Sequence, residues 1–349
     1  MDERVVVRGI QLAVERGQWP EGRISCTAAP VPGGGGVAYQ FSYTHEALFG
    51  GNMTPVEQVC RGLIIRHDGV VLAWPMAKFF NLGEPQCPTL PNLPYEVWEK
   101  IDGSLGIFWH DGDSWRCNTR GSFNNEYTQY ALPEFRLTAP EQWAHPEYTY
   151  MFEIIIPNDP MQRAVKKDPG IYMIAGRYRW TGSDVRIPRV FGHTRVADRL
   201  PGLTVDDLLE QQQHTEHTEG WVVRFDNGFR VKIKTDWYLR VFRMLQQMTP
   251  DHIRDLLVED SKWAESVPDD LRPQALRIAD AIVDRAHELT TRVHRAYGEL
   301  AGIETRKDFA IAVTNQHPDI ARWLFKLRDA KDIVTEIVRT IDVSDLEVE

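Results

Sequence analysis

Lys100 stands in the short sequence Lys100-Ile101-Asp102-Gly103, which places a lysine, a carboxylate and a glycine close together. A lysine amine becomes a nucleophile when neighbouring cations or the loss of solvent lower its pKa. A glycine at this point would let a ligand approach the backbone closely. The same residues also fit a surface turn that begins with a charge, so the motif by itself indicates only a candidate covalent lysine.

Three further charged residues lie in segments that have the pattern of strands. Glu153 interrupts the apolar run from Met151 to Ile156, where a carboxylate is costly unless it is paired or functional. Lys232 and Lys234 are two residues apart, so on a strand they share one face. Two lysines side by side repel each other, and the pair therefore predicts a bound anion between them.

These residues belong to an ordered series of short motifs. In chain order the series is Cys60-Arg61-Gly62, Ala77-Lys78-Phe79-Phe80-Asn81, Lys100 to Ser104, Thr119-Arg120-Gly121-Ser122, Phe152-Glu153, Glu219-Gly220 and Val231 to Tyr238. The series resembles the motifs of the ATP-dependent polynucleotide ligases, which belong to the covalent nucleotidyltransferase superfamily. Two runs, Lys78 to Asn81 and Lys232 to Tyr238, resemble more narrowly the family of bacteriophage T4 RNA ligase 1.

The resemblance implies an ATP-dependent RNA ligase that joins 5′-phosphate and 3′-hydroxyl RNA ends. Such an enzyme forms a lysyl-AMP intermediate, here on Lys100, passes the AMP to the RNA 5′-phosphate and then seals the ends. ATP would be the substrate, Mg²⁺ or Mn²⁺ the metal, and single-stranded or nicked stem-loop RNA the partner. We expect a monomer that acts in RNA repair, including tRNA repair, in the cytoplasm, or in the host cytoplasm for a phage protein.

The resemblance also implies roles for individual residues. The residues expected to bind ATP are Tyr43, Arg61, Lys78, Phe80, Asp102, Gly103, Arg120, Glu153, Lys232 and Lys234. Tyr238 is expected near the same end of the site, while Glu153 and Glu219 are expected to serve the metal. Arg120 stands where close relatives have lysine, which keeps the charge and changes the geometry of its contact. For Phe80, ordinary core packing is an equally open interpretation.

The composition is that of a soluble globular protein, with 42% hydrophobic and 26% charged residues among 349. No run is apolar for long enough to span a bilayer, and the N-terminus is not a secretory signal, so we expect no membrane association. The four cysteines form no Cys-x-x-Cys pair, which predicts neither a zinc site nor a disulfide framework and agrees with a reducing cytoplasm.

The net charge of −10 argues against a protein that coats nucleic acid non-specifically. Residues 251–349 hold 21 acidic and 14 basic residues, a balance of −7, which leaves −3 for the first 250. The acidic excess is therefore concentrated outside the motifs, and a local basic groove near them stays compatible with the total.

Strand patterns dominate the first 240 residues. Hairpins are expected at 61–74, 105–119 and 220–235, with buried strands at 149–157 and 171–176, whereas residues 1–30 show no clear periodicity. The pattern and the resemblance together predict an α+β fold. Residues 1–245 would form an antiparallel-sheet nucleotidyltransferase domain, of the ATP-grasp-like ligase kind, with helices packed outside.

Residues 246–349 are expected to form an all-helical C-terminal domain. Helices are predicted at 274–297, 319–326 and 331–340. The buried face of the first is expected to carry Leu276, Ala279, Val283, Ala286, Val293 and Tyr297.

Two alternatives remain open. A DNA ligase or a capping guanylyltransferase would carry an oligonucleotide-binding barrel with a late basic motif after the lysine-pair strand, and the helical pattern found there favours the RNA ligase type. A nucleotide- or RNA-binding protein with a degenerate ligase fold would lack one or more chemical groups. The groups expected of an enzyme are all present, namely Lys100, Glu153, Glu219, Lys232 and Lys234.

Overall fold

The structure is a computed structural model that describes residues 2–32, 35–138, 144–159, 165–186, 192–247, 249–260, 262–267, 272–344 and 346. The chain divides into two compact units, Met1–Leu239 and Arg240–Glu349. The division falls within helix α6 (Asp236–Gln247), directly after the last sequence motif.

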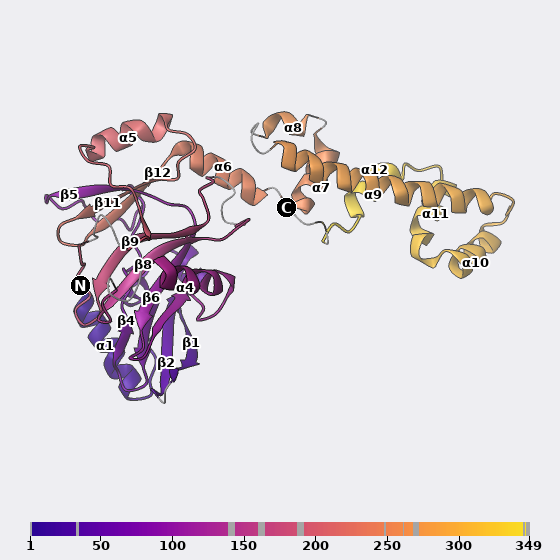
Figure 1. Ribbon diagram of the computed structural model, residues 1–349. Coiled ribbons are helices and arrows are strands. Elements are labelled where there is room, and N and C mark those ends of the chain that lie inside the picture. Colours follow the sequence, from indigo (N-terminus) through magenta and orange to yellow (C-terminus); the bar gives the residue numbers. More distant parts are fainter. Residues whose placement is uncertain are drawn as a thin grey trace. The chain divides into compact units, whose positions relative to one another are not determined.

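Three β-sheets form the framework of the first unit (Figure 1). The first sheet has the order β1-β2-β3-β4, with bounds Ile24–Pro30, Val37–Tyr43, Arg61–Arg66 and Val71–Ala73. The second has the order β10-β9-β8-β6-β7, with bounds Arg195–Val196, Gly170–Tyr178, Tyr148–Ile155, Ser104–His110 and Trp115–Thr119. The third has the order β12-β11-β5, with bounds Arg230–Lys234, Gly220–Phe225 and Tyr95–Glu99. Strand β10 pairs with β9 in parallel, and the other neighbouring strands are antiparallel.

The sheets confirm the predicted α+β class and its antiparallel strands. The expected hairpins are present as β3-β4, β6-β7 and β11-β12. The last of them turns at Asp226-Asn227-Gly228, where Gly228 has a φ of 84° that favours glycine. These turns fix which residues face each other, and so they fix which side chains reach a common surface.

Helices cover the outer faces of the sheets, as expected. Those of the first unit are α1 (Glu3–Glu15), α2 (His45–Phe49), α3 (Pro55–Val59), α4 (Glu126–Thr138) and α5 (Val205–His214). Helix α4 packs on the second sheet through an aromatic cluster of Phe108, Phe135 and Phe152. Because Phe152 and Ile154 belong to this cluster, the alternation of the strand turns Glu153 to the opposite face of the sheet.

Helix α1 is a difference from the sequence expectation, which gave residues 1–30 no clear periodicity. Val6, Val7, Ile10 and Val14 are buried at helical spacing, and Asp2 caps the helix by accepting from the Arg4 N–H. The helix is short and rich in valine, which has only modest helix propensity, so its packing against β3 stabilises it more than its composition does.

The second unit is helical, as predicted. Its elements after α6 are α7 (Pro250–Glu259), α8 (Trp263–Ser266), α9 (Arg272–Glu299), α10 (Arg306–Gln316), the 3-10 turn Pro318–Ile320, α11 (Ala321–Arg328) and α12 (Val334–Thr340). The long helix α9 packs against α7, α11 and α12. It is thus the central element of this unit.

The predicted buried face of α9 is wrong in two positions. Leu276 is 41% exposed and Val283 is 49% exposed, whereas Ile278 and Ile282 are buried. Adjacent helical positions differ by about 100°, so an apolar stripe that is one residue out of phase selects the wrong side chains. The helix ends here were closer to the prediction than the face was.

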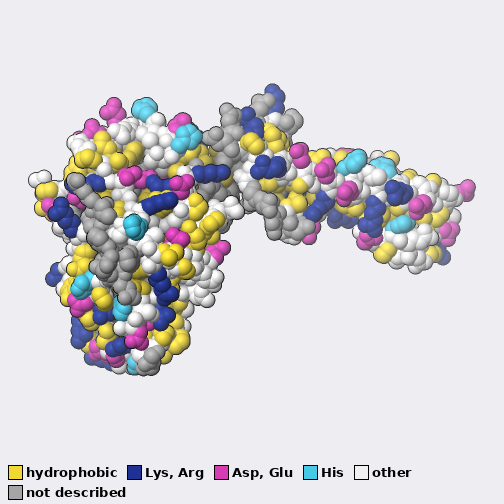
Figure 2. Space-filling view, in the orientation of Figure 1, with side chains coloured by type: hydrophobic (Ala, Val, Ile, Leu, Met, Phe, Trp, Pro, Cys, Tyr) yellow, Lys and Arg dark blue, Asp and Glu magenta, His cyan; other side chains and the backbone are white. Residues whose placement is uncertain are grey.

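No helix in the described residues combines the length and the apolar character needed to cross a membrane. On the face shown in Figure 2, basic and acidic side chains are interspersed with hydrophobic ones in both units. Charges of the two signs therefore alternate on this face.

Candidate active site around Lys100

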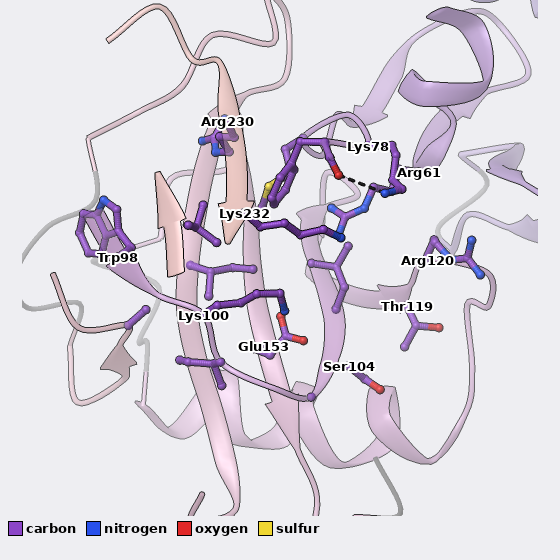
Figure 3. A pocket seen from close by; sticks show the side chains of 18 of the residues that line it. Arg61, Lys78, Trp98, Lys100, Ser104, Thr119, Arg120, Glu153, Arg230 and Lys232 are labelled. Atoms are coloured by element: carbon purple, nitrogen blue, oxygen red, sulfur yellow. Dashed lines mark hydrogen bonds between the residues drawn. The ribbon is translucent and has the colours of Figure 1, made fainter. Parts of the chain in front are cut away.

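A cavity of about 590 Å³ lies in the first unit where its three sheets approach each other (Figure 3). Of the residues chosen from the sequence, it brings together Tyr43, Arg61, Lys78, Lys100, Gly103, Arg120, Glu153 and Lys232. Phe80, Asp102, Glu219, Lys234 and Tyr238 are not among its lining residues. All but Phe80 of this second group contact Lys100 or one another directly.

Lys100 follows directly after β5, and its backbone N–H donates to the Gly220 carbonyl at 3.0 Å. Its side chain is 20% exposed, and Nζ donates to Glu219 Oε2 at 2.6 Å. Burial by itself lowers the pKa of Lys100, but the nearby carboxylates of Glu219, Glu153 and Asp102 outweigh burial and raise this pKa above its ordinary value. The amine is therefore held protonated, in contrast to the lowered pKa that a nucleophile requires.

Glu219 is 2% exposed on its side chain and accepts from two lysines. Its second oxygen, Oε1, lies 2.9 Å from Lys234 Nζ. The next residue, Gly220, has a φ of 141°, and a Cβ there would lie 2.0 Å from the Ile233 carbonyl oxygen. Only glycine lets β11 begin this close to β12, and this close approach brings Glu219 to Lys234.

Asp102 and Tyr238 are joined by a hydrogen bond in which the phenol donates to Asp102 Oδ1 at 3.0 Å. Burial, helped by the charge of Glu219, raises the pKa of Asp102 to about 7. The Lys234 amine lies 4.6 Å from the centre of the Tyr238 ring. Asp102 adds to the negative charge near the Lys100 amine and helps to raise the pKa of Lys100.

Glu153 points from β8 toward the Lys100 amine (Figure 3). Burial raises the pKa of Glu153 to about 7, and Glu219 adds to the rise while Lys100 opposes it. The backbone at Gly103 passes close to β8, since a Cβ at Gly103 would lie 2.7 Å from the Ile154 carbonyl oxygen. The glycine thus serves contact between backbone segments as well as access to the cavity.

Three cations gather at the other end of the cavity. Arg61 and Lys232 lie against the ring of Phe79, with the Arg61 guanidinium 5.9 Å and the Lys232 amine 6.0 Å from its centre, and the Lys78 amine donates to the Phe79 carbonyl at 3.1 Å. Burial, together with Lys78, Lys100 and Lys234, lowers the pKa of Lys232 to about 7.

Two further observations show that an anion would suit this cluster. Burial also lowers the pKa of Lys78. Arg61 Nη1 is buried and has no hydrogen-bond partner in the described part of the chain. A bound polyanion would satisfy this donor and offset the mutual repulsion of the cations.

Tyr43 and Arg120 line the cavity as a pair. The Arg120 guanidinium lies 4.5 Å from the centre of the Tyr43 ring, and Nη1 donates to the Tyr43 carbonyl at 3.4 Å. Phe80 is 8% exposed and packs with Tyr43 and Met53 in a small core cluster. It lines a neighbouring cavity, and the Lys78 amine lies over its ring at 4.8 Å.

Several lining residues were not chosen from the sequence, among them Phe79, Trp98, Ile174, Ala197, Arg224 and Arg230. Arg230 stands two residues before Lys232, so the period-two pattern that selected the lysines would also have found it. No comparable pattern in the sequence points to Ile174 or Ala197. Their place in the cavity wall depends on how β9 and the segment after β10 pack.

The described residues contain no group of three or more His, Cys, Asp or Glu side chains that could hold a metal ion. Glu153 and Glu219 do offer hard oxygen ligands beside the cavity. Mg²⁺ is commonly held by one or two carboxylates together with substrate phosphates, so these residues fit an ion completed by a bound phosphate.

The cavity thus combines three chemical features. Trp98, Ile101, Ile174 and Ala197 give it an apolar wall, Arg61, Lys78 and Lys232 give it a cationic end, and Lys100 lies between acidic neighbours. A ligand with a flat apolar part and a polyphosphate suits this arrangement, with an amine at hand for covalent chemistry.

The chain is similar in sequence to two bacteriophage proteins that are named RNA ligases. The chain is 28% identical over 276 residues to RNA ligase 1 of Bacteriophage TS2126, which covers 71% of this chain and 64% of that protein. It is 22% identical over 364 residues to an RNA ligase of Rhodothermus phage RM378, covering 78% of this chain and 81% of that protein. No family model matches the chain. The resemblance to RNA ligases that the motifs predicted is confirmed by these similarities.

The similarity of this chain to solved structures is weaker than its similarity to these two proteins. An RNA ligase of Naegleria gruberi with ATP and Mn matches 43% of this chain and 51% of its own, at 16% identity and a TM-score of 0.35. A putative ATP-dependent DNA ligase from Aquifex aeolicus matches 89% of this chain and 85% of its own, at 15% identity and a TM-score of 0.45.

Proposed function

We propose that this protein is an ATP-dependent RNA ligase that joins 5′-phosphate and 3′-hydroxyl RNA ends through a lysyl-AMP intermediate on Lys100. The observation that carries the proposal is the position of the Lys100 amine. It lies in one cavity with the cations Arg61, Lys78 and Lys232 at one side and the carboxylate of Glu153 at the other. The two curated relatives are named RNA ligases, which supports RNA as the substrate.

In the first step, Lys100 Nζ attacks the α-phosphorus of ATP. An N–P bond forms, the P–O bond to the β-phosphate breaks, pyrophosphate leaves with the electron pair, and the amine loses a proton. Lys232 and Lys234 would stabilise the negative charge that develops on the α-phosphate oxygens. The apolar wall around Trp98 would hold the adenine.

A proton must leave Lys100 before this attack. Glu219 holds the proton on Lys100 through the 2.6 Å ion pair. A divalent cation bound at Glu153 and Glu219, Mg²⁺ or Mn²⁺, would supply a positive charge that weakens this hold and screens the phosphates. Tyr238 keeps Asp102 oriented beside the amine.

The AMP would then pass to the 5′-phosphate of RNA, and a 3′-hydroxyl would displace AMP to seal the ends. We propose a single-stranded or nicked stem-loop RNA, such as a broken tRNA, as the natural partner. Residues 1–245 would carry the chemistry as a monomer in the cytoplasm, or in the host cytoplasm, and residues 246–349 would guide the choice of RNA.

Mass spectrometry of the intact protein after incubation with ATP and Mg²⁺ tests the proposal. We expect a mass increase of one AMP that is absent in Lys100→Ala and present in Lys307→Ala, a control at an exposed lysine of α10. AMP attached to the Lys100→Ala protein would contradict the assignment of the nucleophile, and a shift with GTP in place of ATP would favour a capping enzyme.

A second assay tests whether the protein seals RNA or DNA. We expect sealing of single-stranded RNA with a 5′-phosphate, and poor use of DNA as the 3′-hydroxyl strand, because the 2′-hydroxyl distinguishes the two. Preferential sealing of a nicked DNA duplex would overturn the RNA assignment.

A further inference from the structure

A second cavity, of about 680 Å³, adjoins the candidate active site. The two cavities share Met76, Lys78, Phe79, Arg224 and Arg230 in their walls. Both lie in the first unit. A molecule released beside Lys78 and Lys232 therefore has a second compartment next to it, reached past two arginines that the motifs do not include.

Arg224 and Arg230 face each other on β11 and β12, where they are register partners. Asp184 holds both, because its Oδ2 accepts from Arg230 Nη2 at 2.6 Å and from Arg224 Nε at 3.2 Å. Arg230 Nη1 also donates to the Gly228 carbonyl at 2.8 Å. The two guanidinium groups are thus fixed in place at the boundary between the cavities.

Positive charge is in excess at this boundary. Arg177 also approaches Asp184, with Nε 3.5 Å from Oδ1, and it donates to both oxygens of Glu3. Three buried or half-buried guanidinium groups therefore meet two carboxylates at the boundary, while Asp2 and Asp226 line the second cavity. Burial lowers the pKa of Arg230, although Asp184 opposes this effect. Because Lys78 and Lys232 adjoin on the other side, an anion would offset the excess.

The in-line geometry of nucleotidyl transfer indicates that this anion is the leaving group, pyrophosphate. In phosphoryl and nucleotidyl transfer the attacking and leaving groups lie roughly in line through the phosphorus. Lys100 attacks from one end, and Lys232 lies between Lys100 and Arg230 in the view of Figure 3. Lys232 and Arg230 are two residues apart on one strand face, so their Cα atoms are about 7 Å apart, a spacing comparable to the length of a diphosphate.

We propose that Arg224 and Arg230, positioned by Asp184, form a pyrophosphate-binding site that receives the leaving group of lysine adenylylation, and that the second cavity is its way out. This inference rests on the proposed function. The released pyrophosphate keeps the bond electrons of the broken P–O bond, and the arginines stabilise its charge.

The reverse reaction tests the site most directly. Adenylylated protein is mixed with increasing pyrophosphate, and the ATP formed is measured for the parent, Arg224→Met and Arg230→Met. We expect the pyrophosphate concentration for half-maximal reversal to rise by about tenfold or more in both variants, equivalent to about 1.4 kcal/mol of binding. Arg116→Met, which removes an arginine paired with Asp111 outside both cavities, is the matched control.

Sealing of pre-adenylylated RNA by the same proteins separates this effect from damage to the fold. That step involves no pyrophosphate, so reversal should lose more than sealing does. Equal losses of reversal and sealing in both variants would overturn the proposal. A selective loss of AMP transfer to the RNA 5′-phosphate, with reversal intact, would also overturn it and would assign the arginines to RNA.

Calorimetric titration with pyrophosphate and with AMP keeps the test independent of the reaction. We expect the variants to bind pyrophosphate about tenfold more weakly and to lose less affinity for AMP. If the parent forms no lysyl-AMP yet shows this pattern, the proposed function fails and the binding site stands. If the parent forms lysyl-AMP and the variants bind pyrophosphate as it does, the site fails alone.

Discussion

Lys100 and Glu219 form an ion pair of 2.6 Å across 119 residues of sequence, and Glu219 extends it to Lys234 at 2.9 Å. Glu219 is the largest influence that raises the pKa of Lys100, so the lysine is held protonated and non-nucleophilic. Activation of Lys100 therefore requires a change in the surroundings of Glu219, and this requirement leads to the first prediction.

Glu219→Gln is expected to lower the pKa of Lys100, because Glu219 is the largest influence that raises this pKa and burial opposes it. Competitive labelling of the free amine, followed by mass spectrometry without ATP or metal, measures the pKa directly. We expect the labelling midpoint of Lys100 to move to lower pH in Glu219→Gln and to stay in place in Glu96→Gln, which removes a surface partner of Arg199. An unmoved midpoint in Glu219→Gln would show that the ion pair does not control the amine. Magnesium-dependent sealing should fall in the same variant.

Lys232→Met is expected to stabilise the fold near neutral pH while reducing activity. The folded pKa of Lys232 is lowered to about 7, so the folded state resists protonation of this amine. The stability associated with Lys232 is thus present above the unfolded pKa, about 10.4, and is lost as pH falls through 7. Methionine carries no charge and removes this loss. The free energy of unfolding of Lys232→Met should therefore exceed that of the parent by on the order of 2 kcal/mol at pH 6–7 and differ little at pH 10.5.

Urea unfolding of Lys232→Met and its parent at several pH values checks this difference. A pH-independent offset reflects only the greater hydrophobicity of methionine. In the assays of adenylylation and sealing, Lys232→Ala and Lys234→Ala should each lose about tenfold or more, equivalent to about 1.4 kcal/mol of transition-state stabilisation. Rates within about twofold of the parent in both would mean that the pair has a structural role.

The effect of Glu153→Gln on stability is expected to grow as pH rises, opposite to the effect of Lys232→Met. The folded pKa of Glu153 is raised to about 7, so the stability it contributes is fully present below the unfolded pKa, about 4.3, and is lost as pH rises through 7. The neutral amide should therefore stabilise the protein at pH 8, by on the order of 2 kcal/mol, and change little at pH 4–5. Unfolding curves at pH 5 and pH 8 provide the measurement. A stability difference that is the same at both would exclude a raised pKa, while magnesium-dependent activity should fall in either case.

A chain that ends after residue 248 is expected to remain soluble and to take up AMP. The motifs are complete by Tyr238, the first compact unit ends at Leu239, and the cavity is lined by residues of that unit. The fragment should lose its preference between a nicked stem-loop and a linear oligonucleotide, since the helices after α6 are proposed to guide substrate choice. Competition between the two RNAs in one sealing assay measures this preference. An insoluble fragment, or one with the parent's preference, would contradict the proposal.

The sequence by itself determined the local geometry of this protein. The turn at Asp226-Asn227-Gly228 predicted a hairpin, and period-two alternation placed Lys232 and Lys234 on one face. The apolar run around Glu153 predicted a strand with a carboxylate that needs a role. These features depend on neighbours within a few residues, and such short-range preferences are readable from the order of amino acids.

The tertiary structure decided which local pieces meet. Periodicity says which face a side chain occupies, but it does not say which strands pair or what that face meets. Glu219 therefore became the partner of Lys100 only when β5 paired with β11. Asp184 likewise met Arg224 and Arg230 only through the packing of distant strands. The protonation state of Lys100 depends on this tertiary packing, because burial and three carboxylates act on the amine together.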